Sequence, residues 1–445
     1  MNTDKQSSGL EFSSFQGLGN NLLDRTKGDK VIWAVVIILT LISILVVYSS
    51  IGSLAYKMNK STESYLFKQV GFIMLGVMII YFAHRVNYTI YSRVATILFL
   101  ISIPLLFYTL KFGSSINEAN RWIKLPVINM TFQTSDLGKL ALFMYMSRQL
   151  SKKQQVIKSF KKGFLPLIIP VIIICLLIAP ANLSTALLIG GISMMLMFIG
   201  RVRSRHILIV VGAALIPLLF LVFISNHYYN KEEHKTKELP AVLTFGRMPT
   251  WIRRVQDFMY ADKAQSSYQV QQAKIAIANG GWFGKGPGKS EQRNFLPHPY
   301  SDFIYAIIIE EYGLTGGVFI ILIYLLFLFR SIRLFQRCPY AFGAFLAVAL
   351  SFTLVIQAMV NMGVNVNLFP TTGVTLPLVS MGGSSLWFTC FAIGIILSVA
   401  RNVEQMEGEK PPVAEVNSQS INETKQESEV NNIQPLDKNA RLFIQ

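Results

Sequence analysis

Residues 280–317 read GGWFGKGPGKSEQRNFLPHPYSDFIYAIIIEEYGLTGG and join a polar loop to a strongly apolar run. This stretch begins as a polar, glycine-rich loop that carries three cations, Lys285, Lys289 and Arg293. One carboxylate, Asp302, stands where a strongly apolar run begins, and Glu310 and Glu311 follow within that run. A basic, flexible loop that leads to a lone acid at a membrane edge predicts chemistry on an anionic lipid.

The composition of the chain places this stretch in a membrane protein. Of the 445 residues, 52% are hydrophobic and only 15% are charged, whereas soluble domains carry about a quarter charged residues. The apolar residues fall in runs of about 20, which is long enough to cross a bilayer. The first run, 31–51, follows a polar segment and is too long for the core of a cleaved signal peptide. We therefore expect a polytopic membrane protein without such a signal.

Ten apolar segments are expected to be transmembrane helices, which gives an all-α polytopic fold with a large extracytoplasmic loop between helices 7 and 8. Their approximate ranges are 31–51, 66–83, 94–110, 136–150, 164–180, 184–200, 206–225, 303–329, 341–362 and 385–400. The short loops rich in lysine and arginine all fall on one side, which the positive-inside rule identifies as cytoplasmic. Both termini are then cytoplasmic, and Asp302 lies at the outer membrane face.

The expected organisation has three parts. A cytoplasmic N-terminal tail, 1–29, precedes a ten-helix membrane domain, 30–401, in which 226–302 is the large outer loop. A disordered cytoplasmic tail, 402–445, is rich in Asn, Gln, Glu and Ser. The net charge of +17 fits cytoplasmic loops that attract anionic lipid, because the bases flank membrane segments instead of covering one soluble face as in nucleic-acid-binding proteins. The three cysteines are isolated and predict neither a disulfide framework nor a metal site.

Polar residues also gather in segment 117–139, NEANRWIKLPVINMTFQTSDLGK. Asp136 and Lys139 are three residues apart, so they can share one helix face. Ionisable groups within the membrane boundary are costly, and they either mark a functional site or pair internally. The spacing alone leaves both interpretations open.

Two further segments interrupt apolar runs. In PANLSTA, 180–186, Asn182, Ser184 and Thr185 either satisfy backbone groups freed by Pro180 or belong to a plain turn. Segment 361–385 contains two prolines and four glycines, so it is not a regular helix. It predicts a broken element that lines a cavity, with a surface loop as the alternative.

The residues around Asp302 leave its role open. Ser301 or Asp302 would make a good N-cap for the helix that follows, and a cap needs no chemistry. One of the two glutamates that follow is expected to face the interior for polar packing. The five histidines have no ligand spacing, and only His298 is near this site.

Taken together, six segments resemble the SEDS family (shape, elongation, division and sporulation), which includes FtsW, RodA and SpoVE. They are NEANRWI, FQTSDLGKLA, PANLSTA, YQVQQAKIAIANGGWFGKGPGKS, LPHPYSDFIYAIIIEEYGLTGG and FPTTGVTLPLVSMGGSS, in order within about 31–401. Family members look like inverting glycosyltransferases that use a polyprenyl-pyrophosphate donor and polymerise lipid II into peptidoglycan outside the bacterial cytoplasmic (inner) membrane. Thr375-Leu376-Pro377 looks more like the division-type FtsW pattern than the RodA pattern, which implies a division role; an elongation role is the alternative.

The resemblance implies Asp302 as the catalytic residue, through the motif SDFI. Asp302 would act as the base or would hold a divalent cation, Mg or Mn. The candidates for binding substrate are Lys139, Asp136, Arg121, Lys285, Lys289, Arg293, Asn182, Thr185 and Ser384. The chain departs from the family pattern where Asn182 and His298 stand in place of family acids and where Thr134 replaces a proline.

The resemblance also implies partners: lipid II as substrate, a class B penicillin-binding protein that supplies the transpeptidase, and other divisome membrane proteins. Two alternatives belong to other classes, namely a lipid II flippase and a non-catalytic scaffold. A flippase needs substrate contacts that are accessible from both faces, whereas the polar clusters here gather on the predicted outer side.

Overall fold

The structure is a computed structural model that describes residues 28–52, 61–116, 119–125, 130–230, 235–236, 239–240, 243–244, 246–260 and 268–408. The chain divides into two compact units, Met1–Val403 and Glu404–Gln445. Almost all of the expected N-terminal tail, and the expected C-terminal tail beyond Gly408, lie outside the described residues. The features discussed below belong to the first unit.

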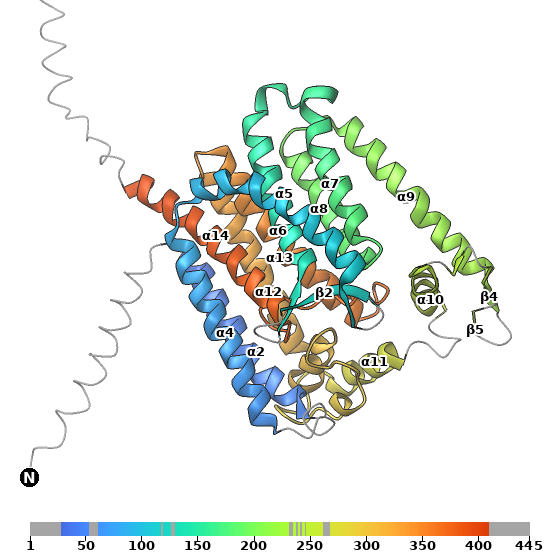
Figure 1. Ribbon diagram of the computed structural model, residues 1–445. Coiled ribbons are helices and arrows are strands. Elements are labelled where there is room, and N and C mark those ends of the chain that lie inside the picture. Colours follow the sequence, from blue (N-terminus) through green and yellow to red (C-terminus); the bar gives the residue numbers. More distant parts are fainter. Residues whose placement is uncertain are drawn as a thin grey trace, which may run out of the picture. The chain divides into compact units, whose positions relative to one another are not determined.

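The described part of the chain is mainly helical (Figure 1). The ten apolar segments correspond to α2 (Lys30–Ser50), α4 (Thr62–Arg85), α5 (Tyr88–Phe112), α6 (Thr134–Lys152), α7 (Leu165–Ile178), α8 (Leu183–Ile199), α9 (Ser204–His227), α12 (Ile304–Arg337), α13 (Ala341–Asn365) and α14 (Ser384–Gly408). Two shorter helices, α10 (Met248–Met259) and α11 (Tyr268–Gly280), lie between α9 and α12. The helix α14 continues past Arg401, where the membrane domain was expected to end.

Eight helices of the described part are long and apolar enough to cross a membrane, which confirms a multi-pass membrane protein. They are α2, α4, α5, α7 with the π-helical turn Phe160–Phe164 before it, α9, α12, α13 and α14. The helix α8 is apolar but has only 17 residues. The helix α6 carries Asp136, Lys139, Arg148 and Lys152 and is not among the eight. The count of ten spans therefore remains a prediction.

A small antiparallel sheet precedes α6, which the all-α expectation did not include. It consists of β1 (Ser114–Ile116), β2 (Ala119–Leu125) and β3 (Met130–Gln133), in the order β1-β2-β3. Trp122 of β2 is opposite Gln133, so the end of β3 is fixed where α6 begins. A second pair of short strands, β4 (Tyr229–Asn230) and β5 (Lys235–Thr236), follows α9.

The helix α13 is central to the packing, whereas α9 lies at the exterior. In the most apolar window of α13, 83% of the residues are buried, compared with 11% in α9. The helix α13 packs against α6, α8 and α12, while α9 packs mainly against α10. Side chains on α13 are therefore the ones that can connect several helices.

The glycine-rich loop after α11 is docked against a kink in α12. Gly313 has a φ of 71°, and a Cβ atom there would be 2.2 Å from the backbone oxygen of Trp282. Gly284, in the loop, is equally close to the helix: a Cβ atom there would be 2.2 Å from the backbone oxygen of Glu311. Only glycine allows so close an approach of two backbones. The backbone amides of Lys285 and Gly286 complete the junction by donating to the oxygens of Glu310 and Glu311.

Candidate active site

The segment between α13 and α14 is a broken element, as the sequence predicted; its first residues, Val366, Leu368 and Phe369, are exposed, and its later part is enclosed by protein. Residues 366–383 are not helical, and most side chains of 374–380 are buried. Polar side chains from other elements satisfy its backbone: Gln357 donates to the oxygen of Thr375 at 3.0 Å, and Asn361 donates to that of Val374 at 2.7 Å. Irregular backbone at membrane depth requires such partners.

Three amides lie on one face of α13, and two of them, Asn361 and Asn365, hold the element that carries Asp302. Gln357, Asn361 and Asn365 follow each other at intervals of four residues, so they lie in one row along the helix. The side-chain amides of Asn361 and Asn365 both donate to the backbone oxygen of Asp302, at 2.9 and 3.0 Å. Asn365 also accepts from the backbone amide of Ala306 at 3.0 Å. These amides were not predicted as site residues, although their spacing within an apolar helix is visible in the sequence.

Asp302 lies in a turn before α12 and does not cap that helix. The N-cap position of α12 is Phe303, which makes no side-chain cap hydrogen bond, and the amide of Ala306 in the first turn is bound by Asn365 of α13. The Asp302 carboxylate accepts a hydrogen bond from the Ser301 hydroxyl at 3.0 Å and is only partly buried. The capping alternative is therefore wrong for both residues, and the carboxylate remains available for another role.

The Asp136–Lys139 pair exists and belongs to a second polar cluster. The ammonium of Lys139 is 3.2 Å from a carboxylate oxygen of Asp136 and donates to the Gln357 side chain at 3.0 Å. The second carboxylate oxygen of Asp136 is buried and has no partner among the described residues. A small polar cavity of about 30 Å³ adjoins the pair; its lining includes Asp136, Lys139, Asn182, Thr185, Thr375 and Ser385. This volume accommodates water but not a sugar.

Other predicted residues reach this second cluster from neighbouring helices. Asn182 is the N-cap of α8 and accepts from the amide of Thr185 at 3.3 Å, so PANLSTA is a turn between two helices. The Ser384 hydroxyl, at the start of α14, accepts from the amide of Gln133 at 3.1 Å. The structure thus brings Asp136, Lys139, Asn182 and Thr185 together in this second cluster, and Ser384 lies at the edge of the cluster. Because Gln357 and Asn361 are one turn apart on α13, this cluster and the Asp302 backbone lie along the same helix face.

Two of the three loop cations, Lys285 and Arg293, hold the loop in place. Lys285 forms ion pairs with Glu291 at 3.1 Å and with Glu310 at 3.8 Å. Arg293 donates to the backbone oxygen of Ser49 in α2 at 2.8 Å. Lys289 is exposed, and the side chain of Arg121 lies outside the described part of the structure.

Both Glu310 and Glu311 of α12 are buried, whereas the sequence led us to expect only one of them to face the interior. Glu310 accepts from the Ser290 hydroxyl and from the amides of Glu291 and Gln292, and Glu311 accepts from the Ser49 hydroxyl. The loop therefore supplies polar partners for Glu310 and α2 supplies one for Glu311, which reduces the cost of burying both acids. Near the site, His298 is exposed and its ring is 3.1 Å from the Tyr300 hydroxyl.

The helix α10 was missed because the segment before α12 was treated as one loop. It packs on the end of α9 (Figure 1), and its Gln256 donates to the backbone oxygen of Ser225 at 2.8 Å. Arg247, just before α10, donates to the oxygen of Ala181 at 2.6 Å. Burial lowers the pKa of Arg254, and neighbouring Arg247 lowers it further, while the carboxylate of Asp302 raises it. Arg254 and Asp302 are therefore close enough to interact.

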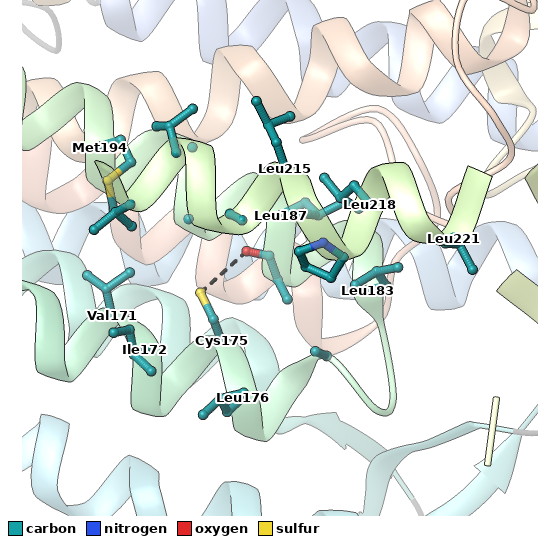
Figure 2. Close-up of a pocket in the computed structure, with 18 of the residues that line it drawn as sticks. Val171, Ile172, Cys175, Leu176, Leu183, Leu187, Met194, Leu215, Leu218 and Leu221 are labelled. Carbon is teal, nitrogen blue, oxygen red and sulfur yellow. Dashed lines mark hydrogen bonds between the residues drawn. The ribbon is translucent and has the colours of Figure 1, made fainter. Parts of the chain in front are cut away.

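An apolar groove of about 600 Å³ lies between α7, α8 and α9, with Met248 and Trp251 of α10 at one end. Figure 2 shows side chains from the three long helices pointing into it, and Cys175 of α7 donating to the backbone oxygen of Ala186 at 3.4 Å. Leu176 is 67% exposed, so the groove opens to the exterior of the helices. This volume lies within the range of ligand-binding sites. The first turns of α8 separate it from the polar cavity, because Leu183 lines the groove and Thr185 lines the cavity.

These features define a multi-pass membrane protein with polar sites on a central helix, next to an apolar groove that opens to the exterior of the helices. The family model FTSW_RODA_SPOVE, described as "Cell cycle protein", matches residues 29–405, so the chain belongs to this family. This finding confirms the resemblance derived from the six motifs.

Individual relatives agree over nearly the whole chain. The chain is 32% identical over 388 residues to "Probable peptidoglycan glycosyltransferase FtsW" of Geobacter metallireducens, with 86% of this chain and 97% of the relative covered. It is 31% identical over 385 residues to "Stage V sporulation protein E" of Bacillus subtilis, with 85% and 98% covered.

Solved structures show the same fold. One is the subject of "Structural coordination of polymerization and crosslinking by a peptidoglycan synthase complex"; its matching chain has a TM-score of 0.65 and 22% identity, with 85% of this chain and 99% of that chain covered. Another is the rod shape determining protein RodA of Thermus thermophilus, with a TM-score of 0.57 and 23% identity over 84% of this chain and 97% of that chain.

Proposed function

We propose that this protein is a peptidoglycan glycosyltransferase that polymerises lipid II into glycan strands at the outer face of the cytoplasmic membrane. The observation that carries this proposal is the arrangement along α13. Asn361 and Asn365 fix the backbone of Asp302, and one turn away Gln357 binds Lys139. Transfer from a polyprenyl-pyrophosphate donor requires a base, positive charge at the leaving group and a groove for the lipid, and here a partly exposed carboxylate, a cation and an apolar groove can supply them. Relatives named as peptidoglycan glycosyltransferases support the same assignment.

In the proposed reaction, Asp302 acts as the general base. It removes the proton from the acceptor sugar hydroxyl while that oxygen forms a bond with the anomeric carbon of the donor. The bond from this carbon to the pyrophosphate breaks, and the pyrophosphate leaves with the electron pair. Positive charge at the leaving group lowers the barrier, and Lys139 is one candidate for it. A single displacement of this kind inverts the anomeric centre.

A divalent cation is an additional element of the proposal, not a requirement of the fold. Among the described residues no group of three or more His, Cys, Asp or Glu side chains forms a metal site. Mg²⁺ commonly binds to one or two carboxylates together with substrate phosphates, and Asp302 can supply one such carboxylate beside a pyrophosphate. Bound there, the ion would neutralise phosphate charge. A chelator that leaves turnover unchanged would remove it from the account.

The proposed biological setting is cell division in the bacterial inner membrane, with both termini cytoplasmic. The relatives named FtsW support the division role, and the positive-inside pattern supports the orientation. The proposed partners are a class B penicillin-binding protein that crosslinks the new strands and other divisome membrane proteins. The relation to a chain of a peptidoglycan synthase complex is consistent with the first of these partners. Depletion of the protein should block septation; blocked elongation with normal septation would instead indicate a RodA-type role.

Polymerisation by the purified protein tests this function. Detergent-solubilised protein is incubated with lipid II, with and without its partner, and glycan strands are separated by size. Because detergent micelles have no second face, a flippase yields no product in this assay. Strands from the wild-type protein support the proposal, and their absence under all conditions would contradict it.

A further inference from the structure

The helix α10 presents basic and apolar side chains on one face. Met248 and Trp251 line the end of the apolar groove. Arg247 and Arg254 are seven residues apart, about two helical turns. Trp251 lies four residues after the first and three before the second, so the two arginines and Trp251 are neighbours on the same face of the helix.

The position of α10 is fixed by packing and by hydrogen bonds. Ile252 is fully buried in a small hydrophobic cluster with Leu221 and Ile224 of α9. Gln256 is buried and accepts from the Thr236 hydroxyl at 2.7 Å in addition to its bond with α9. The 2.6 Å bond from Arg247 to Ala181 then holds this face of α10 at the turn where α8 begins. That turn separates the apolar groove from the polar cavity.

The charge balance at this point favours binding of an anion. The guanidinium of Arg254 is partly buried and is repelled by that of Arg247, while the nearby carboxylates of Asp302 and Asp257 attract it. Asp257 also interacts with Arg253, on a different face of α10. An anion that lies between Arg247 and Arg254 reduces the repulsion between their guanidinium groups. The planar guanidinium donates paired hydrogen bonds to phosphate oxygens, so this pair suits a pyrophosphate.

We propose that α10 binds the polyprenyl-pyrophosphate donor: Arg254, with Arg247, binds the pyrophosphate, and Trp251 and Met248 contact the first isoprenoid units at the end of the groove. This inference rests on the proposed function and names the cations that act on its leaving group. They differ from Lys285, whose ion pairs with Glu291 and Glu310 hold the loop. One helix thus recognises the junction between the charged and the apolar part of the lipid.

Direct binding of polyprenyl pyrophosphate to the full-length protein in detergent tests this site. The variant Arg254→Gln should weaken binding roughly tenfold, since a charge-assisted bond contributes a free energy of that order. The variant Arg254→Lys should recover part of the affinity. The matched control is Arg253→Gln, which removes an exposed arginine next to it on a different face of α10 and should change the affinity less than about twofold, because exposed charges contribute little.

Two further ligands separate the sources of affinity. Inorganic pyrophosphate should compete only weakly with polyprenyl pyrophosphate, and its binding should be weaker in Arg254→Gln protein. The neutral polyprenol should bind equally to wild-type and Arg254→Gln protein. The variant Trp251→Ala should weaken binding of the lipid more than that of inorganic pyrophosphate. Wild-type affinity in a folded Arg254→Gln protein, or an equal loss in Arg253→Gln, would overturn the assignment. Thermal unfolding of each variant identifies those that are folded.

These measurements need no turnover, so the two proposals fail separately. If the wild-type protein makes no glycan but binds the lipid through Arg254, the proposed function is wrong and the site stands. If the wild-type protein makes glycan but Arg254→Gln binds normally, the function stands and the site is wrong.

Discussion

Asn361 donates a hydrogen bond of 2.9 Å to the backbone oxygen of Asp302. The same side chain donates to Val374 in the broken element, so one buried amide joins the turn before α12 to the segment before α14. An aspartate at a membrane edge is positioned by its surroundings only if its backbone is fixed. The proposed chemistry at Asp302 therefore depends on α13 as much as on the SDFI motif.

Removal of this amide is expected to reduce turnover. The variant Asn361→Ala removes the donor to the Val374 oxygen and leaves the Asp302 oxygen with Asn365 alone, and each loss of a buried hydrogen bond costs roughly 1–3 kcal/mol. We expect polymerisation to slow by about tenfold or more, with a smaller change in KM and a lower thermal midpoint. The control is Asn294→Ala, which removes an exposed asparagine of the outer loop. A normal rate in Asn361→Ala would show that the Asp302 backbone needs no such support.

The Asp136–Lys139 pair allows stability and activity to be separated. The variant Lys139→Met leaves the buried carboxylate of Asp136 uncompensated, and breaking a buried pair costs roughly 3–5 kcal/mol. The double variant Asp136→Asn/Lys139→Met should recover much of that stability but not the activity, if Lys139 acts on the donor. Thermal unfolding and the dependence of rate on donor concentration measure the two effects. A double variant that is both stable and fully active would make the pair structural.

The docking of the outer loop on α12 should be sensitive to a single methyl group. The variant Gly313→Ala places a Cβ atom 2.2 Å from the Trp282 oxygen at a φ of 71°, and such overpacking costs about 1–3 kcal/mol. We expect a lower thermal midpoint and faster proteolysis within 281–300. The control is Gly71→Ala in α4, where no other atom lies within 4 Å of the added Cβ. Equal midpoints for the two variants would contradict the close packing.

A lipid bound in the apolar groove between α7, α8 and α9 should protect Cys175 from chemical labelling. Cys175 lines this groove, so a variant with Cys338→Ser and Cys390→Ser offers one thiol there to an apolar, thiol-reactive probe. Lipid II or polyprenyl pyrophosphate should slow labelling of Cys175 severalfold, because the isoprenoid chain excludes the probe. A variant that keeps only Cys338 should label at the same rate with and without lipid. Unchanged labelling of Cys175 at saturating lipid would place the chain elsewhere.

Local patterns in the sequence predicted the long helices but not the short elements between them or the contacts between distant helices. The apolar runs marked every long helix, and the spacing of Asp136 and Lys139 predicted their pair, because both signals lie within one helix. The support of Asp302 by Asn361 and Asn365 joins separate helices, and no local pattern specifies such a pairing. The helix α10 had a visible period in Trp251, Ile252 and Val255, but it is short and lies within a long polar segment.

The small sheet and the docking of the loop were missed for related reasons. Strands β1 and β3 are only three and four residues long, which is too short for a clear alternation of hydrophobic and polar residues. Each of them pairs with β2. The cations Lys285 and Arg293 were interpreted as free charge for a substrate. Their partners Glu310 and Ser49 belong to helices whose approach to the loop depends on the tertiary structure.

The most direct test of the account is glycan synthesis by purified Asp302→Ala protein supplied with lipid II and its partner. The variant should fold and insert normally, because Asp302 does not cap α12 and its hydrogen bonds from Asn361 and Asn365 go to the backbone oxygen. Loss of the base should abolish detectable strands while the binding of polyprenyl pyrophosphate is retained. Glycan strands made at the wild-type rate by the purified variant would contradict the proposed role of Asp302.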